Sequence, residues 1–157
     1  MKLDTVLVPL DGSTLAENAL AVAADLAMPA GARVVLLRAA VAHAYPGHDP
    51  IEAQVTVVRE AETYLDEVAA LVRALGVKDV STSAWYGEAA TAIVEAAAFN
   101  HADLIVMTTH GRSGLGRLVM GSVAESVLRG TTTPILVLRE TSAPVHAPSG
   151  TATSCAG

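Results

Sequence analysis

The sequence predicts a single α/β domain with a doubly wound parallel sheet and helices on both faces. Short apolar runs rich in branched side chains alternate along the chain with longer segments that have helical spacing. Only 3% of the 157 residues are aromatic although 52% are hydrophobic, so aliphatic side chains must form the core. That composition is typical of parallel strands buried on both faces. Right-handed crossovers between such strands place helices on both sides of the sheet.

Particular residues mark where the predicted elements begin and end. Thr14 and Glu17 have the spacing of a capping box, and Pro29 is expected to stop the helix that begins there. Gly76 is the expected C-cap of the second helix. The expected strands are residues 2–10, 34–40, 80–86 (an edge strand), 104–108 and 135–138. The expected helices are residues 14–28, residues 51–75, the segment after Glu88 up to residue 99, and residues 123–128.

The composition changes near the end of the chain. Residues 141–157 contain small residues and two prolines, which predicts a flexible tail after a domain over residues 1–140. The single cysteine, Cys155, allows no disulfide within the chain and no cysteine-based metal site. His43 and His48 match no metal-ligand spacing, and we interpret them as loop residues.

Charge and hydropathy restrict the partners. The net charge of −6 argues against nonspecific nucleic-acid binding, which needs a basic face. No basic-then-apolar leader opens the sequence and no apolar run approaches 18 residues, so we expect a cytoplasmic protein without a membrane partner.

A glycine-spaced loop follows the apolar run over residues 104–108. Four glycines space this loop: Gly111, Gly114, Gly116 and Gly121. Ser122 and Glu125 have capping-box spacing and predict that a helix begins at Ser122. Glycines let backbone N–H groups approach phosphate oxygens, and the first amides of a helix bind anions. If the first and fourth strands are neighbours, this loop and the turn at Asp11 meet in the crevice where such sheets bind ligands.

Several side chains of this region have two interpretations. Asp11 either has a ligand role, in which it accepts hydrogen bonds from ribose hydroxyls or helps to hold a metal ion, or it only shapes its turn. Arg112 and Arg117 are either phosphate ligands or solvated surface residues. His110 is conceivable as a general base, but no nucleophile is paired with it, so we favour a binding or structural role.

The spacing of Gly116 and Gly121 resembles part of a P-loop, but the lysine is missing. That lysine serves the β- and γ-phosphates during transfer, so its absence argues for binding over fast hydrolysis. A slow ATPase or a nucleotidyl-transferring enzyme stays open as an alternative.

The motifs together resemble the universal stress protein family. The resemblance is carried by residues 8–13, residues 107–114 with 121–127, and residues 133–138. It covers residues 1–140 and implies a five-stranded parallel sheet in the order 3-2-1-4-5, a fold of the adenine nucleotide alpha hydrolase-like type. It also implies a homodimer in which the last strands, residues 135–138, pair with each other.

The ATP-binding branch of that family has glycine, two residues, glycine, nine residues, glycine, then Ser or Thr. Gly111, Gly121 and Ser122 match, whereas Thr108 stands at the first glycine and cannot offer the same backbone approach. Thr108 therefore supports the alternative, a dimeric universal stress protein that binds no nucleotide and works through protein partners.

The resemblance implies a stress-response or signalling protein that binds ATP, ADP or AMP with Mg²⁺ or Mn²⁺. Asp11 is also a candidate metal ligand, although a metal role is less expected for it than nucleotide binding. The candidate nucleotide-binding residues are Pro9, Asp11, Ala39, Met107, Thr108, His110, Gly111, Arg112, Gly114, Gly121, Ser122, Val123 and Ala124.

Overall fold

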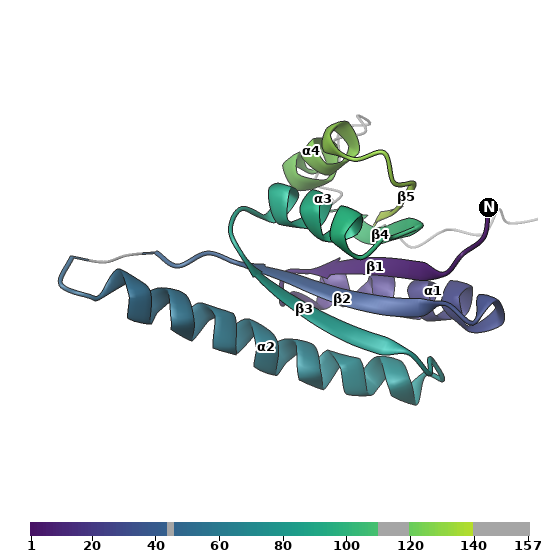
Figure 1. Cartoon of the computed structure of the whole chain (residues 1–157), viewed down its shortest axis with the longest axis horizontal. Helices are drawn as coiled ribbons and strands as arrows, with labels where there is room; N and C mark the ends of the chain where they lie inside the picture. The colour runs from purple at the N-terminus through teal and green to yellow at the C-terminus, as the bar shows by residue number, and fades with distance from the viewer. Residues whose placement is uncertain (44–45, 110–119, 140–157) are drawn as a thin grey trace, which may run out of the picture.

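The computed structural model describes residues 1–43, 46–109 and 120–139 of the chain. Its centre is a five-stranded parallel sheet in the order β3-β2-β1-β4-β5, which confirms the predicted order and the doubly wound topology (Figure 1). The elements in chain order are β1 (Thr5–Leu10), α1 (Thr14–Ala30), β2 (Arg33–Ala40), α2 (Pro50–Ala74), β3 (Val80–Tyr86), α3 (Ala89–Phe99), β4 (Leu104–Thr109), α4 (Ser122–Gly130) and β5 (Ile135–Arg139).

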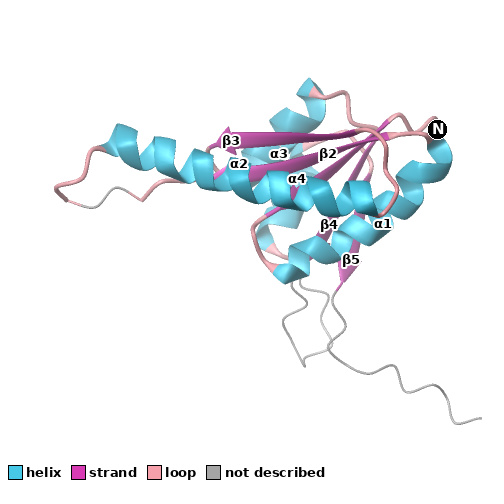
Figure 2. Cartoon of the chain, turned by 90° about the horizontal axis from the view of Figure 1, so that it is seen from below, coloured by secondary structure: helices cyan, strands magenta, loops and turns pink. Residues whose placement is uncertain are grey.

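Two helices cover each face of the sheet. Helices α1 and α2 lie on one face and α3 and α4 on the other (Figures 1 and 2). Side chains of β1 alternate between these faces: Val6 and Val8 are buried against α1 and α2, and Leu7 is buried in the cluster with α3 and α4. Both faces of the central strand are therefore dry, which is why its sequence is apolar without alternation.

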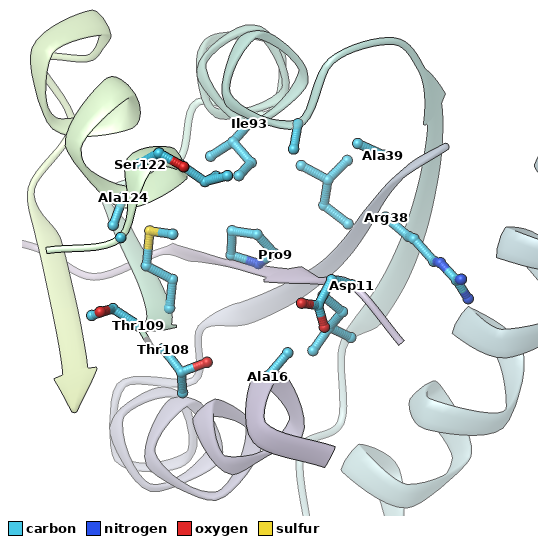
Figure 3. A pocket seen from close by; sticks show the side chains of 16 residues that line it. Pro9, Asp11, Ala16, Arg38, Ala39, Ile93, Thr108, Thr109, Ser122 and Ala124 are labelled. Atoms are coloured by element: carbon cyan, nitrogen blue, oxygen red, sulfur yellow. The ribbon is translucent and has the colours of Figure 1, made fainter. Parts of the chain in front are cut away.

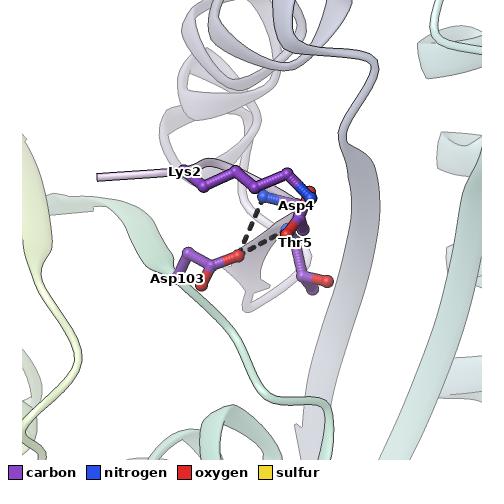
Figure 4. Close-up of polar contacts among 4 residues, drawn as sticks. All are labelled: Lys2, Asp4, Thr5 and Asp103. Atoms are coloured by element: carbon purple, nitrogen blue, oxygen red, sulfur yellow. Dashed lines mark hydrogen bonds and ion pairs between the residues drawn. The ribbon is translucent and has the colours of Figure 1, made fainter.

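β1 begins at Thr5 and not at residue 2 as predicted. The backbone N–H groups of Asp4 and Thr5 each donate to the Asp103 carboxylate, with N···O distances of 2.9 Å (Figure 4). Lys2 forms a 3.0 Å ion pair with Asp4. The first amides of β1 therefore bond to Asp103, a side chain that lies just before β4.

The prediction that Thr14 and Glu17 form a capping box is wrong. Ser13 is the N-cap, and its hydroxyl accepts from the N–H of Ala16 at 3.2 Å. The helix also continues through Pro29 and ends at Gly31, which has φ 64°, the left-handed conformation that glycine favours at helix ends.

The other predicted elements occur with ends shifted by one or two residues. Asp49 caps α2 through a 2.8 Å bond from the N–H of Ile51, and its C-cap is Leu75, so the predicted cap Gly76 lies one residue further on. β3 is an edge strand, as predicted. Within the described residues, no helix has the length and hydropathy needed to cross a bilayer. The predicted tail, residues 141–157, lies outside the described residues.

Candidate functional site

A cavity of about 300 Å³ lies at the carboxyl ends of β1, β2 and β4 (Figure 3). β1 pairs with β2 on one side and with β4 on the other, so the chain leaves the centre of the sheet in both directions. This is the reversal of strand order at which open parallel sheets bind ligands. The adjacency of the first and fourth strands, on which the predicted crevice depended, is confirmed.

The predicted site residues fall into two groups. One group lines the cavity: Pro9, Asp11, Ala39, Met107, Thr108, Gly121, Ser122, Val123 and Ala124. The other group lies outside the described residues: His110, Gly111, Arg112 and Gly114, together with the loop residues Gly116 and Arg117.

The sheet and α3 form an apolar end of the cavity. Leu37, Met107 and Ile93 are buried side chains that line it, and Pro9 and Ala39 complete the surface. Apolar walls with a few placed polar groups are typical of sites for small organic ligands. This end suits a flat, weakly polar group such as a nucleobase.

The backbone of Ala39 adds an acceptor to that end. The carbonyl of Ala40 accepts from the N–H of Gly87 on the β3 side at 3.0 Å. Successive carbonyls of a strand point to opposite sides, so the Ala39 carbonyl points toward β1. Pairing with β1 ends at Leu10 and Arg38, so β1 has no residue in register with Ala39.

Asp11 shapes its turn and also lines the cavity. One carboxylate oxygen accepts from the N–H of Ser13 at 2.9 Å and from the Ser13 hydroxyl at 2.5 Å. Asp11 therefore shapes its turn, as one of the two interpretations predicted. Because Asp11 is also exposed at the cavity, this structural role does not exclude a contact with a ligand.

The start of α4 lacks the side-chain cap predicted for it. Gly121 is the N-cap, Ser122 is the first helical residue, and within the described residues no side chain bonds to the first amides. The predicted partner, Glu125, instead forms a 2.8 Å ion pair with Arg129. Gly121, Ser122 and Val123 all line the cavity, so an uncapped helix start lies beside it. The unpaired amides and the helix dipole favour an anion there.

The two threonines at the end of β4 point to opposite faces of the sheet. Val106 packs with α1 and α2 while Met107 packs with α3 and α4, so by alternation Thr108 faces α1, as Figure 3 shows, and Thr109 faces α4. Thr109 is buried, and its hydroxyl lies 3.9 Å from the position that a Cβ on Gly121 would take. The side chain of Thr108, the residue that departs from the family motif, therefore points away from the start of α4.

Packing against the described residues does not require a glycine at position 121. Its φ of −58° is open to any residue, and an added Cβ would make only an ordinary contact with Thr109. An alanine there would fold with little strain and would test how closely a ligand approaches the helix start.

Some cavity residues were not predicted from the sequence. They are Leu10, Ala16, Leu37, Arg38, Ala89, Ile93 and Thr109. Most of them lie near the end of a strand or the start of a helix at the carboxyl edge of the sheet, where open parallel sheets bind ligands.

Comparison with known proteins identifies relatives of this architecture. The profile of the Universal stress protein family matches residues 2–139. A universal stress protein of Methanocaldococcus jannaschii is 32% identical over 140 residues, covering 86% of this chain and 81% of the relative.

Two solved structures share the fold. A crystal structure of a universal stress protein in complex with cAMP aligns with a TM-score of 0.69 and 23% identity, covering 88% of this chain and 98% of that chain. The universal stress protein from Archaeoglobus fulgidus in complex with dAMP aligns with a TM-score of 0.65 and 22% identity, covering 87% and 98%.

Proposed function

The chain belongs to the universal stress protein family, and we propose that it binds an adenine nucleotide in the cavity beyond β1, β2 and β4 as a stress-response or signalling module. The observation that carries this proposal is the uncapped start of α4 beside an otherwise largely apolar cavity. Structural relatives in complex with cAMP and with dAMP support the same ligand class.

The apolar end would hold the base. Pro9 and Met107 provide surface for the ring, and the Ala39 carbonyl can accept from an exocyclic amino group at its edge. Adenine offers an amino donor at its 6-position, whereas guanine offers a carbonyl acceptor there. A carbonyl facing a carbonyl leaves both unpaired, so we expect a preference for adenine.

The polar end would hold the sugar and phosphates. The Asp11 carboxylate can accept hydrogen bonds from ribose hydroxyls, and the amides of Ser122 and Val123 can donate to a phosphate. The Thr109 and Ser122 hydroxyls lie at this end. Local dipoles must hold the phosphate against the net charge of −6. The assignment of His110, Gly111, Arg112 and Gly114 to the phosphates stays a prediction.

A divalent cation would depend on the nucleotide for its ligands. In the described part of the chain, no three His, Cys, Asp or Glu side chains are placed to hold a metal ion together. Mg²⁺ commonly binds phosphate oxygens, waters and one or two carboxylates. ATP with Mg²⁺ or Mn²⁺ therefore fits best as a preformed complex in which Asp11 supplies one oxygen.

We propose binding, with at most slow hydrolysis. Among the described residues that line the cavity, Asp11 and Arg38 are the charged ones, and one Asp11 oxygen is already bonded to Ser13. General-base catalysis needs a group free to take a proton near the reacting atoms.

Titration calorimetry on the full chain, first freed of copurified nucleotide, tests the proposal. We expect saturable one-to-one binding of AMP, ADP and ATP in the presence of Mg²⁺, and at least tenfold weaker binding of GMP. The absence of heat with all three adenine nucleotides would refute it, and equal binding of GMP would refute the role of Ala39.

A second candidate function is self-association without nucleotide. β5 is an edge strand whose apolar residues Ile135–Leu138 are only half-buried, which leaves an unpaired apolar edge. Sedimentation equilibrium of the nucleotide-free chain should give a dimer if β5 pairs with its copy. A monomer under these conditions would remove this candidate.

A further inference from the structure

Arg38 is a cavity residue that the nucleotide contacts proposed above do not use. It is the last β2 residue paired with β1, opposite Leu10. Its guanidinium lies against the turn that follows Asp11: a Cβ built on Gly12 would lie 3.2 Å from Nη2 and 3.4 Å from Nη1. Gly12 has φ 85°, so this close approach uses a conformation that other residues rarely adopt. The guanidinium is thus placed beside the turn that follows Asp11, the residue proposed to bind the ribose.

Tyr64 of α2 holds the guanidinium in this position. The Arg38 Cζ lies over the Tyr64 ring, 4.7 Å from its centroid, which is a cation–π contact. The Tyr64 hydroxyl donates to the Glu17 carboxylate of α1 at 2.9 Å. Burial and this bond to Glu17 raise the pKa of Tyr64, so it stays a neutral donor. Side chains from α1 and α2 therefore fix an arginine of β2.

The carboxylates nearest to this cluster have other partners. Asp11 accepts from Ser13, and Glu17 accepts from Tyr64. In the described parts of the chain, ion pairs within 4.0 Å join only Lys2 to Asp4 and Arg129 to Glu125, and none involves Arg38. The cation–π contact thus leaves the Arg38 charge without a carboxylate partner among the described residues, and the N–H groups of a guanidinium can bind a phosphate through two parallel hydrogen bonds.

We propose that Arg38 makes the site selective for adenine nucleotides that carry a second phosphate on the ribose 2′ or 3′ oxygen. The proposal rests on the proposed function. With the base at Ala39 and the 5′-phosphate at Ser122, the 2′,3′ edge of the ribose faces Asp11 and Gly12. Figure 3 shows Ser122 and Arg38 on opposite sides of the cavity, with the Arg38 side chain extending outward past Asp11 toward α2. A phosphate on the outer edge of the ribose would therefore meet the guanidinium at the rim of the cavity, while the 5′-phosphate stays at Ser122. An arginine beside the ribose makes the same discrimination in dinucleotide-binding folds.

Calorimetry with three ligands on the full chain tests this selectivity. The ligands are AMP, adenosine 3′,5′-bisphosphate and adenosine 2′,5′-bisphosphate, and the readout is the ratio of dissociation constants between AMP and each bisphosphate. We expect one bisphosphate to bind the wild type about tenfold more tightly than AMP, as for a charge-assisted pair. The two bisphosphates distinguish the 2′ from the 3′ position.

Variants assign the preference to the guanidinium. Arg38→Gln should bring the ratio close to one, and Arg38→Lys should leave an intermediate ratio because a point charge replaces the planar fork. Arg59→Gln is the matched control, since it removes the same charge from an exposed position on α2 and should keep the wild-type ratio. Tyr64→Phe keeps the ring and should keep most of the preference, whereas Tyr64→Leu should lose it.

The outcomes separate the two proposals. If the wild type binds AMP but neither bisphosphate more tightly, or if Arg38→Gln keeps the full preference, the role of Arg38 is refuted while nucleotide binding stands. If the wild type binds none of the three ligands, the proposed function itself fails. Circular dichroism of each variant shows whether it is folded before its ratio is compared.

Discussion

Ser13 and Ser122 both stand at the start of a helix, but only Ser13 caps one. The Ser13 hydroxyl accepts from the N–H of Ala16, whereas α4 begins at Gly121 without a side-chain cap from the described part of the chain. A hydroxyl that bonds its own helix stabilises the fold, and a hydroxyl left at the cavity is available to a ligand. We therefore expect a change at Ser13 to affect stability and a change at Ser122 to affect the proposed binding.

We expect Ser13→Ala to lower the free energy of unfolding by about 1 kcal/mol, because it removes a helix cap. Ser122→Ala should change that free energy by less than about 0.5 kcal/mol, since alanine is a good helix former, and should weaken nucleotide binding several-fold. Urea denaturation measures the first effect and calorimetry the second. A stability loss at Ser122 equal to that at Ser13 would show that Ser122 has a capping role after all.

Asp11 allows the turn to be separated from the ribose contact. In Asp11→Asn the amide oxygen can still accept from the Ser13 N–H, so the turn should persist. The loss of a charged acceptor should weaken AMP binding about tenfold, while binding of the 2′,3′-dideoxy analogue should change little. Asp25→Asn removes an exposed charge elsewhere on α1 and serves as the control. Equal weakening for both ligands would contradict a contact between Asp11 and the ribose.

At the scale of elements, Asp103 joins the starts of β1 and β4. Its carboxylate accepts from the N–H groups of Asp4 and Thr5, and these bonds lower the pKa of Asp103 (Figure 4). Because the native state holds the ionised form, its contribution to stability is complete above the unfolded pKa near 4 and is lost as the pH falls through the lower native pKa.

We expect Asp103→Ala to cost about 1–2 kcal/mol of unfolding free energy at pH 7, from two lost hydrogen bonds to a charged group. The difference from the wild type should shrink as the pH is lowered below 4. Asp66→Ala, at an exposed position on α2, should show little effect at either pH. A difference that is independent of pH would indicate that packing, and not the carboxylate charge, accounts for the cost.

The existence and order of the elements follow from local patterns, but their ends do not. Because helices cover both faces of the sheet, its central strands are continuous apolar runs, and the helices that cover it show helical spacing of apolar residues. These patterns predict the strands and the helices. Glu17 and Glu125 have capping-box spacing, but neither caps its helix. Glu17 instead accepts a hydrogen bond from Tyr64 of α2, and Glu125 forms an ion pair with Arg129 of its own helix. The position of Arg38 could not be predicted from the sequence, because only the fold brings Gly12 and Tyr64 to it.

At the scale of the whole molecule, the described elements all precede the predicted tail. The family profile ends at residue 139, and all described elements precede residue 140. A chain shortened to residues 1–140 should therefore keep the melting temperature of the full chain within about 2 °C, since it loses no described packing. Differential scanning fluorimetry measures this. A large fall in melting temperature would show that residues 141–157 pack against the domain.

The doubly wound sheet explains why the cavity forms where it does. The chain leaves β1 toward β2 and β4 toward β5, so the loops after β1 and β4 diverge and leave a crevice between them. One wall is apolar sheet, and the other carries Asp11 and the start of α4.

A crystal structure of the full chain grown with ATP and Mg²⁺ tests the central claim most directly. We expect density for the base against Ala39, the ribose at Asp11, and phosphate oxygens within hydrogen-bond distance of the amides of Ser122–Ala124. Crystals at saturating nucleotide in which this crevice holds only solvent, or in which the nucleotide lies elsewhere on the molecule, would contradict the account.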